Sequence, residues 1–205
     1  MSARELATQC TRIGAAVLPS AGIAGALVGC AWIALSPDGV AARSAMVSHI
    51  PRGIGPLVAA IVVAARVGAM FAGELGEARV GQQADWLRAA GLGRLRHLVA
   101  PRLVATALVL PVVTLVVDAA ALAAVSLLGE PRGVAALAQL APVDVWVGLA
   151  KAALFGVTLA GVASAIGLLR QGTRPDVPRL ASLGAVAAVL AVVALDLLLV
   201  ASRSS

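Results

Sequence analysis

The chain is poor in the aromatic side chains on which many ligand-binding surfaces are built. Its 205 residues contain no tyrosine, two phenylalanines and three tryptophans, so aromatic residues make up 2% of the sequence. Proteins that bind nucleic acid combine basic patches with aromatic stacking surfaces. The formal net charge here is +6, but the arginines stand between apolar stretches and are not interleaved with aromatics. This pattern argues against a nucleic-acid partner.

Lysine is almost absent as well, because Lys151, between Ala150 and Ala152, is the only one in the chain. The P-loop of nucleotide-hydrolysing proteins requires the pattern G-x-x-x-x-G-K-[ST], whose lysine contacts the phosphates. No such pattern surrounds Lys151. The chain itself is therefore not a P-loop ATPase.

Metal-ligating and nucleophilic residues are few and isolated. Cys10 and Cys30 follow no redox or metal-binding spacing, and His49 and His97 have no second ligand at metal-binding distance in the sequence. No serine stands in a G-x-S-x-G context. The sequence therefore predicts no disulfide, no metal site and no catalytic centre.

Apolar residues dominate what is present. Hydrophobic residues make up 60% of the chain and charged residues 13%, and the mean hydropathy is +0.98. A membrane-spanning helix needs about 20 largely apolar residues. Five apolar stretches approach this length, over residues 13–35, 55–73, 103–128, 145–169 and 180–201. We therefore expect a single all-α domain over residues 1–205, an integral membrane bundle of five transmembrane helices.

The prolines fit these helix boundaries in part. Pro56 and Pro101 stand near the starts of the second and third spans, and Pro178 stands just before the fifth. A proline costs little at a helix start, because the first N–H groups have no partner within the helix. Pro19 and Pro111 fall inside spans, where we expect them to kink or break the helix.

Two pairs of small residues are spaced for close helix packing. Gly25 and Gly29 form a G-x-x-x-G pair in the first span, and Gly68 with Ala72 forms a similar pair in the second. Such pairs also arise by chance in a chain rich in glycine and alanine. A specific contact and a chance spacing both stay open for each pair.

The arginines predict the orientation in the membrane, because short loops rich in arginine or lysine stay cytoplasmic. Arginines gather before the first span, between the second and third, and between the fourth and fifth: Arg4, Arg12, Arg79, Arg88, Arg94, Arg96, Arg102, Arg170, Arg174 and Arg179. The other segments hold fewer: Arg43, Arg52, Arg132 and Arg203. We expect a cytoplasmic N-terminus and an extracytoplasmic C-terminus.

The segment between the second and third spans, residues 77–98, has the pattern of an amphipathic helix. Its apolar and small residues recur at helical spacing: Val80, Ala84, Leu87, Gly91, Leu95 and Leu98. Polar residues occupy the other faces, and Gly91 and Gly93 interrupt the helix. Such a cytoplasmic helix could dock a soluble partner or lie on anionic lipid. The periodicity alone does not separate these two readings.

Motifs in this region resemble the MlaE/YrbE family of permeases. The matching residues occur in the family's order: Gly55 and Pro56, Arg66 to Ala69, Glu74 to Gly76, Val80, Gln83, Asp85, Leu87, Gly91, Pro101 and Arg102. Further likeness extends along the chain: Leu18 and Pro19, Gly25, Lys151, Phe155 and Gly156, Gly167 and Leu168, and Asp196. The resemblance thus covers nearly all of the sequence.

The resemblance implies a lipid-transporting permease subunit in the inner (cytoplasmic) membrane of a bacterium. Its expected partners are a second permease copy, a cytoplasmic P-loop ATPase that binds ATP and Mg²⁺, and an extracytoplasmic lipid-binding protein of the MCE type. The family's cytoplasmic coupling helix corresponds to residues 77–98. The residues carried over as ATPase contacts are Glu74, Arg79, Gln83, Asp85, Leu87 and Arg88. No cofactor is expected on this chain.

The sequence also departs from the family pattern. Gln82 replaces a glutamate, and Trp86 replaces an alanine, so the expected coupling surface has lost a negative charge and gained bulk. Ala84 stands in place of an isoleucine and Ala65 in place of a glycine. Family members usually begin with an interfacial amphipathic helix, whereas residues 1–12 offer at most a short stub.

Four charged residues lie within or near the ends of the spans: Arg66, Asp118, Lys151 and Asp196. An ionised side chain at the bilayer centre costs at least about 2.5–3.5 kcal/mol, so each must pair, reach the interface or face a wet cavity. They could contact a lipid headgroup along the substrate path, or form interhelical ion pairs. Arg66 and Glu74 are too far apart along one helix to pair, so we expect their partners on other helices or a second subunit.

Two other functions remain open at this point. One is a membrane scaffold that has kept the fold without conducting lipid, and the altered coupling segment and short N-terminus favour it. The other is an ion-coupled secondary transporter that would use Arg66, Asp118 or Asp196 as a relay.

Overall fold

The computed structural model describes residues 3–35, 49–80, 99–128, 141–169 and 177–204. Nearly every one of these residues is helical, and none lies in a strand. The elements are α1 (Ala3–Leu35), η1 (Ile50–Ile54), α3 (Gly55–Val63), η2 (Ala64–Gly68), α4 (Ala69–Val80), α6 (Ala100–Leu128), α8 (Pro142–Leu169) and α9 (Val177–Ser204). The two η elements are π-helical turns, so the continuous run from η1 to α4 is one helix with two widened segments.

Five helices in the described ranges are long and apolar enough to cross a membrane. They cover Leu6–Leu35, Ile50–Ala78, Ala100–Leu128, Pro142–Leu168 and Pro178–Ser202. The prediction of an all-α protein with five spanning helices is therefore confirmed. The expected coupling helix lies mostly outside the described residues, because α4 ends at Val80 and the next described residue is Val99. That helix stays a prediction.

The helices are longer than the apolar stretches that predicted them. The first begins at Ala3, although its apolar stretch begins at Ile13. Leu6 and Cys10 pack partly buried against the core, which explains why the polar N-terminal residues continue the helix. The second span likewise runs beyond residues 55–73 at both ends. Hydropathy therefore located the spans but underestimated their lengths.

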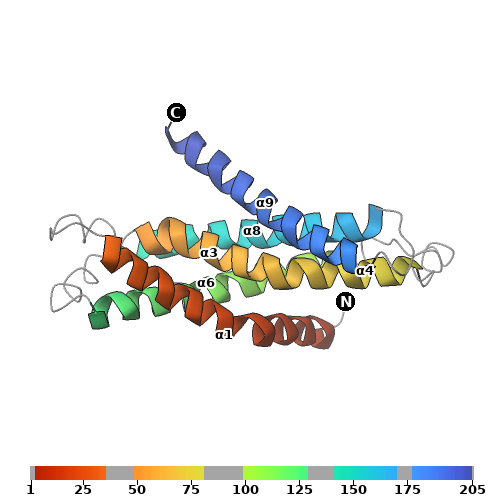
Figure 1. Cartoon of the computed structure of the whole chain (residues 1–205), viewed down its shortest axis with the longest axis horizontal. Helices are drawn as coiled ribbons and strands as arrows, with labels where there is room; N and C mark the ends of the chain where they lie inside the picture. The colour runs from red at the N-terminus through yellow and green to blue at the C-terminus, as the bar shows by residue number, and fades with distance from the viewer. Residues whose placement is uncertain (1–2, 36–48, 81–98, 129–140, 170–176, 205) are drawn as a thin grey trace.

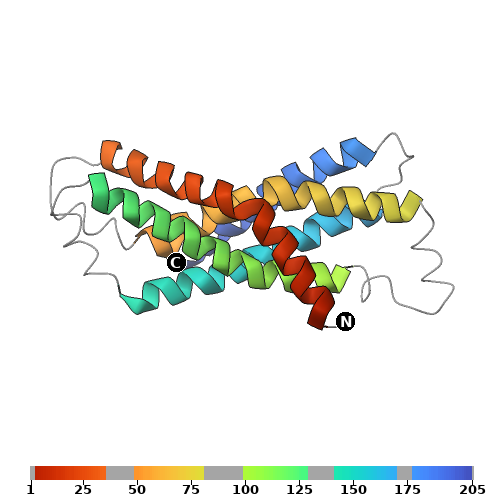
Figure 2. The ribbon, with the colours of Figure 1, turned by 90° about the horizontal axis from the view of Figure 1, so that it is seen from below.

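The helices run up and down through one elongated bundle. The start of α1, the end of α4, the start of α6 and the start of α9 lie at the same end, where α8 also ends (Figure 1). The end of α1, the end of α6 and the starts of η1 and α8 lie at the opposite end, and the view from below agrees (Figure 2). Residues 81–98 connect the last turn of α4 to the first turn of α6. Both turns lie at the end of the bundle where α1 begins (Figure 1).

Small residues bring the helices into close contact. A Cβ atom added at Gly25 or Gly29 would overlap the backbone of α6 at Val117 and Ala121. The Gly25–Gly29 pair is therefore a true contact surface, on which α1 and α6 pack side by side (Figure 2). On the second span, a Cβ atom at Gly184 of α9 would overlap Ala72. Both spacings noted in the sequence thus mark helix contacts.

Neither internal proline breaks its helix. Pro19 lies at the midpoint of α1, and Pro111 lies within α6, and both helices continue past them. Figure 2 shows that α1 changes direction along its length. A proline removes one backbone hydrogen bond and displaces the carbonyl four residues earlier, which accounts for a bend.

The last helix leaves the bundle. The first half of α9 packs against α4 and α8, and Val192, Leu195 and Leu199 still reach the core, while the end of the helix diverges from the bundle (Figure 1). The large apolar side chains Leu190, Leu197, Leu198 and Val200 are exposed there. In a single chain, these residues form an apolar face without a protein neighbour among the described residues.

Candidate functional site

A cluster of three charged side chains ties three helices together at the end of the bundle where α1 begins. Glu74 of α4 lies 2.7 Å from Arg12 of α1 and 3.0 Å from Arg102 of α6, with a different carboxylate oxygen facing each arginine. The side chain of Arg12 is 58% exposed, whereas those of Glu74 and Arg102 are 26% and 12% exposed. We call Arg12, Glu74 and Arg102 the arginine clasp.

The inner arginine of the clasp is anchored twice. The Arg102 guanidinium carbon lies 5.5 Å from the ring centroid of Phe71, which is fully buried. A cation over an aromatic face is attracted by the ring's negative surface, and more strongly where water is excluded. Arg102 therefore fixes α6 against both Glu74 and Phe71 of the second span.

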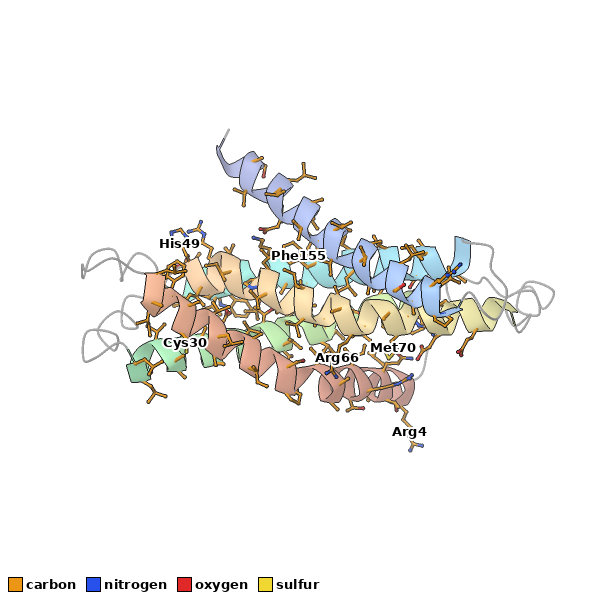
Figure 3. All side chains as sticks on the ribbon, in the orientation of Figure 1. Arg4, Cys30, His49, Arg66, Met70 and Phe155 are labelled. Atoms are coloured by element: carbon orange, nitrogen blue, oxygen red, sulfur yellow. The ribbon has the colours of Figure 1, made fainter. Side chains whose placement is uncertain are left out.

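A buried ion pair joins α8 and α9. Lys151 Nζ contacts Asp196 Oδ1, and the two side chains are 7% and 15% exposed. Lys151 Nζ also lies 5.5 Å from the ring centroid of Phe155, which Figure 3 labels within the bundle. Of the two readings open for these residues, the structure shows the interhelical ion pair. This pair fixes α9 at the level where it leaves the bundle.

Arg66 lies on the surface of the described chain, in the π-helical turn η2. Its Nη1 atom donates a hydrogen bond to the carbonyl oxygen of Ala16 on α1, at 3.0 Å, close to where Figure 3 shows α1 and the second span side by side. Ala16 lies in the turn that Pro19 perturbs, because Pro19 has no N–H to donate. The exposed guanidinium of Arg66 donates one hydrogen bond to this carbonyl oxygen. It makes no other polar contact with a described residue.

Asp118 is buried within α6, against the start of the second span. Its side chain packs on Gly55 so closely that a Cβ atom there would overlap Oδ1. Within the described residues neither carboxylate oxygen has a hydrogen-bond partner. Asp118 thus differs from Arg66, Lys151 and Asp196, which all make polar contacts.

The sequence did not single out four of the residues in these contacts as site residues: Arg12, Arg102, Arg52 and Asp144. Arg12 was counted only as a charge that sets the topology, and Arg102 as such a charge and as a residue that matches the family pattern, yet both pair with Glu74. Their predicted location on the same side of the membrane as Glu74 was the available signal. Arg52 and Asp144, 3.3 Å apart, form a further ion pair at the opposite end. Nothing in their spacing indicated that pair, because 92 residues separate them.

The expected ATPase-contact residues are only partly described. Glu74 belongs to the arginine clasp, and Arg79 lies in the last turn of α4. The others lie outside the described residues: Gln83, Asp85, Leu87 and Arg88. As expected, the partners of Arg66 and Glu74 come from other helices and not from each other.

No group of three metal-ligating side chains occurs within the described ranges. Cys10 and Cys30 are free thiols, and His49 is exposed. His97 lies outside the described residues. Seven charged residues are instead arranged in ion pairs between helices, an arrangement that can hold or transmit a helix movement: Arg12, Arg52, Glu74, Arg102, Asp144, Lys151 and Asp196.

Comparison with known proteins gives a consistent result. A family model described as Permease MlaE matches residues 6–202. The chain is 32% identical over 129 residues to the protein trigalactosyldiacylglycerol 1, chloroplastic, of Arabidopsis thaliana, covering 59% of this chain and 37% of that protein. It is 34% identical over 119 residues to a probable ABC transporter permease protein of Rickettsia prowazekii, covering 54% and 46%.

A probable ABC transporter permease protein of Synechocystis is 40% identical over 65 residues, which cover 32% of this chain and 25% of that protein. The aligned parts thus span less than half the length of these curated relatives. The family model, in contrast, covers the chain from the start of the first span to the end of the last.

Proposed function

The chain belongs to the MlaE permease family and is a multi-pass membrane permease, and on this premise we propose that it moves phospholipid or another hydrophobic lipid as the membrane subunit of an ABC-type transporter. ATP and Mg²⁺ would bind to a separate cytoplasmic ATPase. Two relatives carry the name of probable ABC transporter permeases, and a third carries the name of a galactolipid. These names support both the ATPase partner and the lipid substrate.

The arginine clasp is the observation that carries the coupling part of this proposal. Glu74 lies two turns before the end of α4, and Arg102 lies in the first turn of α6. These two helices flank residues 81–98, which the family resemblance assigns to ATPase docking. Because Glu74 also holds Arg12, a displacement of the segment would reach α1 as well as α4 and α6.

This geometry gives Glu74 a different role from the other residues assigned to the ATPase. Both of its oxygens are engaged by arginines of its own chain, so Glu74 would transmit movement and not touch the partner. Direct contact is left to Arg79, Gln83, Asp85, Leu87 and Arg88. In this mechanism, nucleotide-driven movement of the ATPase rotates the end of α4, and the clasp passes the rotation to α1.

Arg66 is the best-placed cation for a lipid headgroup. Lys151 is neutralised by Asp196, whereas Arg66 is exposed and has donors to spare among the described contacts. A guanidinium binds phosphate through paired N–H donors. The apolar walls of the spans suit acyl chains. We therefore assign headgroup contact to Arg66.

A second permease copy fits the exposed apolar face of α9. Leu190, Leu197 and Leu198 are large and exposed, and the end of the helix diverges from its own bundle (Figure 1). The proposed complex also includes an MCE-type lipid-binding protein on the extracytoplasmic side. The N-terminus would be cytoplasmic, in a bacterial inner membrane, and the C-terminus extracytoplasmic, as the arginine distribution predicts.

Purification of the tagged chain in mild detergent, followed by mass spectrometry of bound proteins and lipid, tests this function. A stoichiometric P-loop ATPase, an MCE-type protein and enriched phospholipid are the expected result. Asp85→Lys should abolish ATPase binding, whereas Asp176→Lys makes the same charge change in the other predicted cytoplasmic loop and should leave it intact.

Two outcomes would reject the proposal in favour of another function. A chain that binds lipid-binding protein without any ATPase would indicate a non-conducting scaffold. Lipid or ion movement that needs no ATPase and stops on dissipation of the proton gradient would indicate an ion-coupled secondary transporter. Retained stoichiometric ATPase binding by Asp85→Lys would remove that residue from the docking surface without rejecting the permease function.

A further inference from the structure

Asp118 is the one deeply buried carboxylate of the described ranges that faces no opposite charge. Its side chain is 5% exposed, and neither carboxylate oxygen has a hydrogen-bond partner among the described residues. Asp144 and Asp196, in contrast, pair with Arg52 and Lys151. The proposed transport mechanism makes no use of Asp118.

The backbone beside Asp118 supplies no donor either. Asp118 Oδ1 lies against Gly55, where η1 passes into α3. The N–H of Gly55 already donates to the carbonyl of Ile50, and the next residue, Pro56, has no N–H. The neighbouring turns of α6, at Val117 and Ala121, are covered by the glycines of α1.

The ionisable groups on the surrounding elements are already engaged or exposed. On η1 the only one is Arg52, which pairs with Asp144 of α8, and the other on α8 is Lys151, which pairs with Asp196. Helix α3 carries none. The remaining ionisable side chains near this end of the described bundle, Cys30 and His49, are exposed.

An ionised carboxylate in such surroundings is strongly unfavourable. The effective penalty for burying an unpaired ion in a protein is several kcal/mol, whereas a neutral carboxylic acid avoids most of it. A metal cation would need several oxygen ligands, and no group of three His, Cys, Asp or Glu side chains that could hold one occurs among the described residues. The proton is the one ligand that such a site can hold.

We propose that Asp118 is a proton-binding site: the carboxylic acid packs against Gly55, and the proton is lost to water when the start of the second span separates from α6. The reaction breaks only the O–H bond of the acid and leaves a hydrated carboxylate. A ligand that binds one of two arrangements favours that arrangement. The bound proton therefore stabilises the contact between the second span and α6, and rising pH weakens it.

Infrared spectroscopy of the full chain in lipid bilayers tests the protonation state directly. The C=O stretch of a carboxylic acid is separate from the carboxylate bands. We expect an acid band at neutral pH that Asp118→Asn removes and Asp196→Asn retains. Isotopic labelling of aspartate carboxyl carbons should shift the same band in the unaltered chain, so the assignment does not depend on a variant that folds. Absence of an aspartic acid band at neutral pH would overturn the proposal.

Hydrogen exchange measured at several pH values tests the link to packing. The amides of residues 50–63 should lose protection in the unaltered chain as pH rises, after correction for the intrinsic exchange rate. Asp118→Asn keeps a neutral side chain of the same size, so its protection should not change with pH. Equal pH dependence in both proteins would show that proton loss and separation of the second span are not linked.

Discussion

Most charged side chains inside this apolar bundle are matched by a partner on another helix. Lys151 faces Asp196, and Glu74 is held between Arg12 and Arg102. Pairing limits the cost of taking an ion out of water, but removing one partner leaves the other charge buried and uncompensated. The stability of each contact therefore depends on how deeply it is buried.

The Lys151–Asp196 pair provides a test of this dependence. Lys151→Ala should destabilise the chain by about 3–5 kcal/mol, because Asp196 would keep a buried, unpaired charge. The double variant Lys151→Ala with Asp196→Ala should recover much of this loss. The free energy of unfolding in mixed micelles measures both effects.

Arg12→Ala is the matched control for that experiment. Arg12 is 58% exposed, and Glu74 would keep its contact with Arg102, so removal of Arg12 should cost no more than about 1 kcal/mol. A loss at Arg12 equal to that at Lys151 would contradict the argument from burial.

The contact between Gly55 and Asp118 makes a second prediction for single residues. Gly55→Ala should destabilise the chain by about 1–3 kcal/mol, because the new Cβ atom would overlap Asp118 Oδ1. Asp118→Ala should relieve the overlap, so the double variant should unfold with nearly the stability of Asp118→Ala alone. Gly53→Ala, where the added atom meets nothing within 4 Å, is the control.

At the scale of helices, close packing is determined by where glycine stands on each face. Gly25 and Gly29 touch the backbone of α6, whereas Gly22 of the same helix has open space around it. Without large side chains at the contact, dispersion between closely approaching backbones holds membrane helices together. The two kinds of glycine on α1 should therefore respond to substitution in opposite ways.

Gly25→Ala should lower the free energy of unfolding by about 1–3 kcal/mol, since the methyl group would displace α6. Gly22→Ala should raise it by up to about 1 kcal/mol, because alanine is the better helix former and meets no neighbour. Unfolding in mixed micelles distinguishes the two. A stabilising Gly25→Ala would show that α1 does not pack on α6 through this face.

The helices and their number could be predicted from sequence, but their ends and widened turns could not. Five apolar stretches near spanning length are enough to identify five helices. The first ten helical residues of α1 are polar in character, and they are helical because Leu6 and Cys10 reach the core. Neither hydropathy nor local propensity predicted the π-helical turns η1 and η2.

At the scale of the whole molecule, the charged contacts depend on which helices meet. Charge patterns placed Arg12, Glu74 and Arg102 at the same side of the membrane, but only the fold shows that one carboxylate serves both arginines. The pair between Arg52 and Asp144 could not be foreseen, since nothing local links two residues so distant in sequence. The prediction that intramembrane charges need partners on other helices was correct for Lys151.

The arginine clasp leads to a prediction for the assembled transporter. Glu74→Gln keeps the size of the side chain but removes the charge that holds Arg12 and Arg102. The partner ATPase should still bind and hydrolyse ATP, while lipid movement per ATP should fall several-fold. Asp144→Asn, which removes a carboxylate charge from the pair with Arg52 at the opposite end of the bundle, is the control and should leave that ratio unchanged. Loss of ATPase binding in Glu74→Gln would instead place Glu74 on the docking surface.

The most direct test of the permease function is ATP-dependent lipid transfer in proteoliposomes. The chain and the proteins that co-purify with it would be reconstituted together, and the movement of a fluorescent phospholipid would be followed on addition of ATP and Mg²⁺. Transfer that requires ATP, and that stops when the ATPase carries a substitution in its own P-loop lysine, is the predicted result. Transfer that proceeds equally without ATP, or no transfer from a complex that hydrolyses ATP, would contradict a role as an ATP-driven lipid permease.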